Sequence, residues 1–315
     1  MKIEVLITDL DPTENLINRI KNIIAFCLKD YEYSEDNLDT IIISDDAHFK
    51  KAVQRFNPNG VYTKDEVYVA VGKNFPILTT EGKVKHSVIF HSSVFNAIFS
   101  GLQKSSDPEN WEDEECRFLF VIYHEIAHCI DNQKRGIRIN RPIRRDDKLF
   151  KIRNVANYYI DILKDEFVSC VIAGFAMRKK VFDLEMKSTN EAIEERLSEA
   201  KALRNRYYKD NGLLYEIAFA VSGTIWTILI QYGKLIGSKI VNRQLTNVSM
   251  NLWNGGSEAS RKVLTQFEEG LGKFWDSYPD FSDAFDEFLF GIWSALALCL
   301  GYKFLETNTF DEIFW

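Results

Sequence analysis

Two histidines four residues apart enclose a glutamate in the apolar stretch FLFVIYHEIAHCIDN, residues 118–132. On an α-helix, residues i and i+4 share one face, so the rings of His124 and His128 can reach a single metal ion. Zinc accepts histidine nitrogens at roughly 2.0–2.1 Å. Glu125 projects beside that face, where its carboxylate can take a proton from an attacking water instead of binding the metal. The spacing therefore predicts a zinc site with Glu125 as general base.

The pattern alone is suggestive, because a His-Glu-x-x-His match arises by chance in about one chain in a hundred of this length. Its surroundings favour the zinc interpretation, since the match lies inside a strongly predicted helix that follows several predicted strands. The competing interpretation is a pair of core histidines with polar neighbours. Burying two histidines and a glutamate in one turn without a metal or other partners would be costly.

A catalytic zinc site needs a third protein ligand and an open fourth position. No histidine follows His128 in the chain. We therefore expect a carboxylate from the next long helix, where YYIDILKDEFVSCVIAGFAM, residues 158–177, offers Asp161, Asp165 and Glu166. We favour Glu166, because small side chains follow it on the same helical face and would let two helices pack closely around an ion. Asp161 and Asp165 stay open as alternatives.

At these residues the chain resembles the gluzincin metallopeptidases, particularly the compact bacterial and phage-associated zinc proteases of the ImmA/IrrE-like kind. The resemblance covers roughly residues 40–180. It implies that His124, His128 and Glu166 hold Zn²⁺ and that Glu125 is the catalytic base. It also implies an N-terminal lobe whose edge strand binds an extended peptide beside the metal helix, a position to which we assign HSVIFHSSVF, residues 86–95.

Three further side chains are candidate donors to the oxyanion that forms when water attacks a carbonyl, namely Tyr158, Tyr159 and His91. Packing is the competing interpretation for each of them. Cys129 lies about 100° round the helix from His128, so we expect a core thiol that points away from the metal.

The elements that must hold these residues fall into two parts. Before residue 112, strand and helix patterns alternate, with strands predicted at 2–8, 39–44, 66–72 and 85–95 and helices at 14–30 and 47–56. Beyond it, long helices are predicted at 112–132, at 154–177 and throughout the region after 188. The fold class is thus α+β, with a zincin-like lobe of a small mixed sheet and metal-binding helices followed by an all-helical region packed on it.

A domain boundary near residue 185 is predicted because Ser188 and Glu191 have the spacing of a helix N-terminal capping box. The two domains would be residues 1–185, the metallopeptidase, and 186–315, the helical region. Two apolar runs in the second domain, 217–230 and 288–301, are about 14 residues each, whereas a membrane span needs roughly 20. Buried helices are the better interpretation.

Composition narrows the remaining choices. The 315 residues are 46% hydrophobic and carry a net charge of −7, which does not favour nucleic acid or an anionic membrane as partner. A basic connection at residues 134–153 is the exception, and a solvated loop explains it best. The five cysteines form no CxxC pair, and the N-terminus lacks the features of a signal peptide, so a cytoplasmic protein with reduced thiols is expected.

These observations together predict a zinc-dependent metallopeptidase that hydrolyses a peptide or protein substrate. The alternative is a non-catalytic zincin-like module, binding or regulatory, in which the metal only joins the helices. An intact Glu125 argues against the alternative, because a structural metal site has no use for that carboxylate.

Overall fold

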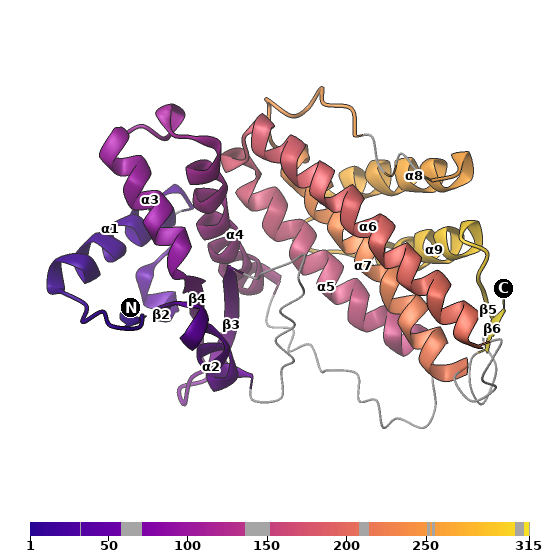
Figure 1. Ribbon diagram of the computed structural model, residues 1–315, viewed down its shortest axis with the longest axis horizontal. Coiled ribbons are helices and arrows are strands. Elements are labelled where there is room, and N and C mark those ends of the chain that lie inside the picture. Colours follow the sequence, from indigo (N-terminus) through magenta and orange to yellow (C-terminus); the bar gives the residue numbers. More distant parts are fainter. Residues whose placement is uncertain are drawn as a thin grey trace. The chain divides into compact units, whose positions relative to one another are not determined.

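A computed structural model describes residues 1–31, 33–57, 71–135, 152–207, 214–250, 253, 256–305 and 312–314 (Figure 1). The chain forms two compact units. The first consists of Met1–Arg138 and Ile172–Val181, and the second of Ile139–Val171 and Phe182–Trp315. Helices dominate and a small mixed sheet accompanies them, so the predicted α+β class is confirmed. The predicted domain boundary at residue 185 is a different division of the chain and stays a prediction.

The first unit is built on a four-stranded sheet with the spatial order β1-β2-β4-β3. Strands β1 (Lys2–Leu6), β2 (Leu38–Ser44) and β4 (Val84–His91) are parallel, and β3 (Gly72–Leu78) runs antiparallel to β4. Helix α1 (Glu14–Asp30) connects β1 to β2, as the predicted β-α-β opening requires. The predicted strand at 66–72 lies mostly outside the described residues, and the observed strand begins at Gly72.

Helices cover both faces of this sheet. Side chains alternate between the two faces along each strand, and Val88 and Phe90 of β4 join a core with α1 and α4 (Asp113–Arg135). Their neighbour Ile89 points to the opposite face, where it packs against Phe49 of α2 (Asp46–Phe56). The metal-binding pattern therefore lies on the α1 face, because it belongs to α4.

One strand prediction and one assignment were wrong. The predicted strand at 85–95 ends at His91, and α3 (Ser92–Lys104) begins at once, with the His91 ring capping its first turn through Nδ1, 3.3 Å from the Ser93 amide. Val94, Phe95 and Ile98 have helical spacing and join the core that includes α4, which the strand prediction missed. The stretch assigned as the peptide-binding edge strand is β4, which lies between β2 and β3. The edge strand that contacts α4 is β3.

The second unit is mainly helical. It contains most of α5 (Ile152–Ala173), α6 (Lys179–Tyr207), α7 (Leu214–Ile240), α8 (Glu258–Trp275) and α9 (Asp283–Cys299). Its all-helical prediction was wrong in one respect, because β5 (Lys303–Leu305) and β6 (Glu312–Phe314) form an antiparallel pair. The proposed capping box was wrong too: Ser188 lies inside α6, which begins nine residues earlier at Lys179. In the described part of the chain, no helix is long and apolar enough to cross a membrane.

Stacked aromatic rings and one close approach between α5 and α7 hold the helices of the second unit together. The rings of Trp226 on α7 and Trp293 on α9 stack with centroids 5.9 Å apart. Gly237 lets α7 approach α5 so closely that a Cβ atom there would lie 2.5 Å from the Phe167 carbonyl oxygen. This approach brings the α7 side chains beside the acidic stretch of α5.

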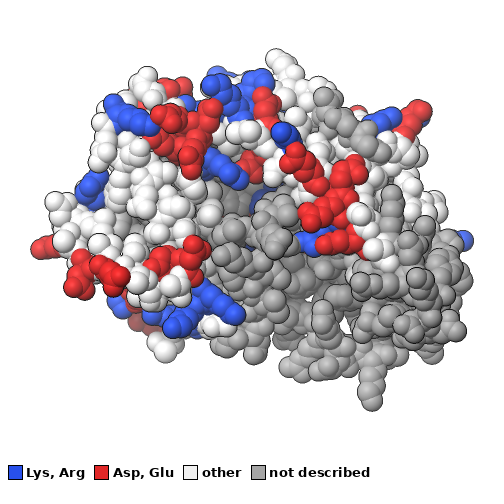
Figure 2. All heavy atoms as spheres, in the orientation of Figure 1, with Lys and Arg blue, Asp and Glu red and all other residues white. Residues whose placement is uncertain are grey.

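Charged side chains of both signs are interspersed on the described surface. Figure 2 shows lysine and arginine beside aspartate and glutamate on the face it presents. Several of these form ion pairs, such as Lys2 with Glu4 at 2.7 Å. Most of the basic connection predicted at 134–153 lies outside the described residues.

Candidate metal centre

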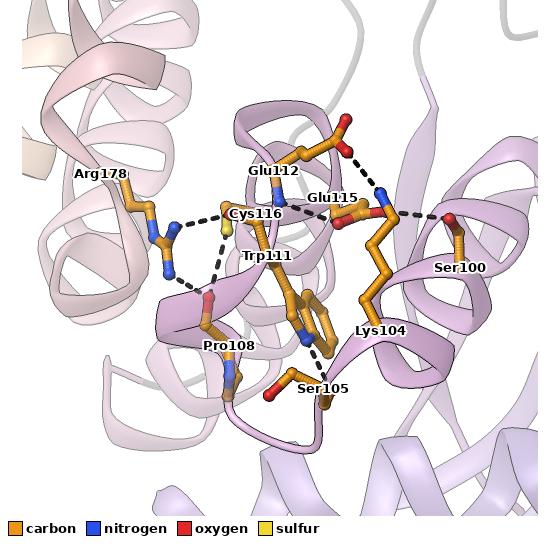
Figure 3. Close-up of polar contacts among 9 residues, drawn as sticks. All are labelled: Ser100, Lys104, Ser105, Pro108, Trp111, Glu112, Glu115, Cys116 and Arg178. Carbon is orange, nitrogen blue, oxygen red and sulfur yellow. Dashed lines mark hydrogen bonds and ion pairs between the residues drawn. The ribbon is translucent and has the colours of Figure 1, made fainter.

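The beginning of α4 is fixed by a polar network (Figure 3). Glu115 accepts hydrogen bonds from the Glu112 amide at 2.9 Å and from the Ser100 hydroxyl at 2.9 Å, and it pairs with Lys104 at 2.7 Å. The Lys104 ammonium and these donors lower the pKa of the Glu115 carboxyl. Arg178 donates to the main-chain carbonyls of the loop that precedes the helix. Acidic residues in the first turn also suit the positive end of the helix dipole.

Further along α4, buried polar contacts hold the turns on either side of the histidines. The Tyr123 hydroxyl donates to Asp30 of α1. Asp131, with a fully buried side chain, pairs with Arg135 one turn later, whose Nε lies 2.6 Å from Oδ1. The helix is therefore held by hydrogen bonds at several points as well as by its apolar contacts.

His124 and His128 are buried, with residues 8% and 7% exposed. Their Nε2 atoms face each other at 3.1 Å, and their rings are inclined at 80°. Two nitrogens bound to one tetrahedral zinc at about 2.05 Å would be about 3.3 Å apart. The observed pair fits that requirement, because both nitrogens that could bind a metal converge on one point.

Glu166 completes a possible ligand set. One carboxylate oxygen of Glu166 and the ring nitrogens of His124 and His128 all lie within 4.8 Å of one another. No other group of this kind is found in the described ranges, and neither Asp161 nor Asp165 takes part in this one. Two nitrogens and one carboxylate oxygen are a donor set that suits zinc. These three residues could therefore bind a metal ion.

Lys234 lies beside Glu166, the predicted carboxylate ligand. The ammonium of Lys234 on α7 is 3.1 Å from Oε2 of Glu166, and the two side chains are 37% and 25% exposed. The close approach at Gly237 explains this proximity, because Lys234 lies one turn earlier on the same helix. The Lys234 ammonium thus lies at ion-pair distance from the carboxylate that could bind a metal ion.

The Glu125 side chain differs from its neighbours. The residue is only 7% exposed, yet within the described part of the chain no hydrogen bond or ion pair reaches its carboxylate. Gly72 of β3 covers it, since a Cβ atom at that position would lie 2.7 Å from Oε1. Packing against β3, and no described hydrogen bond, therefore defines the surroundings of this carboxylate.

The edge strand is also joined to the Glu125 main chain by Asn74. Its Nδ2 donates to the Glu125 carbonyl at 3.1 Å and to the Cys129 sulfur at 2.8 Å, while Oδ1 lies 2.9 Å from Nδ1 of His86. Cys129 is fully buried, in line with the predicted core thiol. The sequence reasoning passed over Gly72 and Asn74, and only a correct assignment of β3 as the edge strand beside α4 could have indicated them.

Ring packing describes the three candidate oxyanion donors. His91 follows Ile89 on the sheet face opposite α4, and its ring contacts Phe49 of α2. Tyr159 stacks on Trp226, and its hydroxyl would lie 2.9 Å from a Cβ atom at Gly223. Tyr158 packs edge to face against Tyr159. Burial raises the pKa of both tyrosines. The packing interpretation accounts for all three residues.

Comparisons of the chain with protein-family models, with curated proteins and with solved structures give no match.

Proposed function

We propose that the chain is a zinc-dependent metallopeptidase of the gluzincin type, with a zincin-like lobe formed by the first unit. His124, His128 and Glu166 hold Zn²⁺, and Glu125 is the general base. The observation that carries the proposal is the convergence of two imidazole nitrogens at 3.1 Å beside a buried carboxylate that no described group holds. A purely structural arrangement would not need such a carboxylate.

Each residue has a separate task in this proposal. A zinc ion at this position supplies Lewis-acid chemistry, since it polarises a carbonyl group and lowers the pKa of a bound water. Glu125 accepts the proton of the attacking water and gives it to the leaving amine. Lys234 keeps the carboxylate of Glu166 oriented.

The edge of the sheet supports a peptide substrate. The His91 amide donates to the Val71 carbonyl at 2.8 Å, so Val71 belongs to a hydrogen-bonded pair of the β3–β4 ladder. Bonding alternates along an antiparallel ladder, which turns the main-chain groups of Gly72 and Asn74 toward the side of β3 where no described strand lies. An extended peptide can pair with such an edge, here directly beside Glu125.

The deciding experiment measures zinc in protein purified without chelator and the hydrolysis of fluorescein-labelled casein. We expect one zinc per chain in the wild type, and loss of zinc in His128→Ala and in Glu166→Gln. Glu125→Gln should keep zinc and lose hydrolysis. A wild type without zinc refutes the proposal. If the wild type binds zinc but hydrolyses no casein, and Glu125→Gln has the same zinc content, the alternative holds: a non-catalytic module with a structural metal.

A further inference from the structure

Gly72 stands where a side chain and the Glu125 carboxylate cannot both fit. A Cβ atom on Gly72 would lie 2.7 Å from both Cγ and Oε1 of Glu125 and 2.9 Å from Cδ. Carbon and oxygen atoms that are not bonded do not approach so closely. The backbone at Gly72 is not in the left-handed region, so the requirement for glycine here comes from the neighbouring side chain and not from the chain conformation.

Asn74 fixes the distance between this glycine and the helix. Both residues lie on the α4-facing side of β3, because side chains two apart in a strand share a face. The Asn74 amide donates to the main-chain carbonyl of Glu125 itself, and His86, 2% exposed, holds the other end of the carboxamide. The strand is thus attached to the turn that carries Glu125, and it cannot recede if a side chain is added at position 72.

We infer that Gly72 is a positioning residue for Glu125: the absence of a side chain there defines where the carboxylate lies, and Asn74 keeps the strand at that distance. The kinetic consequence rests on the proposed function, whereas the contact itself does not. In Gly72→Ala, the end of the Glu125 side chain has to move while the metal ligands His124 and His128 stay in place.

The contact is tested by a double-mutant cycle in thermal unfolding with chelator present, which needs neither metal nor activity. We expect Gly72→Ala to lower Tm by about 1–2 °C in the wild type, since the flexible end of the Glu125 side chain can move aside, and to cause no loss in a Glu125→Ala background, where the space is vacant. Asn74→Ala is the matched comparison. It removes a bond to the main chain, so its effect on Tm should be the same in both backgrounds.

The kinetic arm uses labelled casein and zinc analysis on the same proteins. Gly72→Ala should lower kcat about 100-fold with KM and zinc content unchanged, because displacing a catalytic group by about 1 Å has effects of that size. Gly291→Ala, at an exposed glycine where a Cβ atom meets nothing within 4 Å, should match the wild type. An equal Tm loss in both backgrounds, or an unchanged kcat, overturns the inference. A wild type that binds zinc but does not hydrolyse refutes the proposed function, and the Tm cycle then still decides the contact.

Discussion

Replacing Glu125 by glutamine should make the protein more stable when no metal is bound. The residue is 7% exposed, and its carboxylate has no hydrogen-bond donor within the described ranges. Burying a polar group without a partner costs about 1–3 kcal/mol in mutational studies, and a charge is worse than a neutral amide of the same shape. The Glu125 oxygens are not fully buried, so only part of this cost applies. We therefore expect Glu125→Gln to raise the free energy of unfolding by at most about 1 kcal/mol.

The matched control is Glu115→Gln on the same helix. Glu115 is 5% exposed, so its burial is nearly the same, but its carboxylate accepts from Ser100, Lys104 and the Glu112 amide. Loss of the charge weakens these bonds, and we expect this variant to lose about 1 kcal/mol. The two substitutions are chemically identical, so the sign of the effect depends only on whether partners are present.

Thermal unfolding in the presence of a chelator measures both variants. For a chain of 315 residues, about 1 kcal/mol corresponds to a shift of roughly 1.5 °C in Tm. A rise for Glu125→Gln with a fall for Glu115→Gln is the expected result. If both variants lose stability, the Glu125 carboxylate has a stabilising partner, and the argument that it is held ready for proton transfer fails.

Three other predictions concern metal binding, an ion pair and acid sensitivity. Zinc at 100 times its Kd should stabilise the wild type by about 2.7 kcal/mol in thermal melts and leave His128→Ala unchanged. Asp286→Asn should cost about 2–3 kcal/mol in urea unfolding, because the side chain of Lys164, 2% exposed, loses this ion pair. Lys164→Met should cost less than about 1 kcal/mol, since the side chain of Asp286 is 36% exposed. Hydrogen bonds from Thr8 lower the pKa of Asp45, so its stabilising effect is complete above about pH 4 and lost in more acidic solution. Asp45→Asn should flatten that part of the stability–pH curve.

Local sequence signals predicted the elements that carry the metal-binding pattern. The acidic first turn and the apolar residues spaced four apart placed the start of α4 within one residue and its end within three residues of the observed bounds. The β-branched runs at either side of α1 gave two parallel strands, because the intervening helix requires a crossover. These predictions succeeded since each depends on the period of side chains along a single element.

The spatial order of the strands within the sheet was harder to predict from the sequence. The stretch at 86–95, which contains most of β4, was assigned as the edge strand because β4 is the strand nearest to α4 in the sequence. However, β4 pairs with β2 on one side and with β3 on the other, so it is an interior strand. The helical spacing of residues 94–99 was overlooked because the β-branched and aromatic residues around it favour a strand. Neither the edge position of β3 nor the importance of Gly72 follows from any local pattern.

The third ligand could be ranked because helical geometry separates the three candidates. At 100° per residue, Glu166 shares a face with Cys170 and Ala173, whereas Asp161 and Asp165 project elsewhere. Cys170 and Ala173 are 1% and 0% exposed, and the backbone beside Cys170 meets Gly237 of α7. The small residues after Glu166 thus indicated a packed face, which is also the reason that its carboxylate is held against Lys234.

Two glutamates on one helix, Glu115 and Glu125, differ in their hydrogen-bond partners and not in their burial. Glu115 and Glu125 are buried to nearly the same degree, and their neighbours in the sequence give no indication of their partners. The difference arises from other elements, because α3 supplies donors to Glu115 whereas β3 presents a bare glycine to Glu125. Burial alone would have classed the two residues together. Their hydrogen-bond partners assign Glu115 to holding the helix and leave Glu125 without such a task, which is why opposite signs in the paired substitutions are the strictest test of the proposed base.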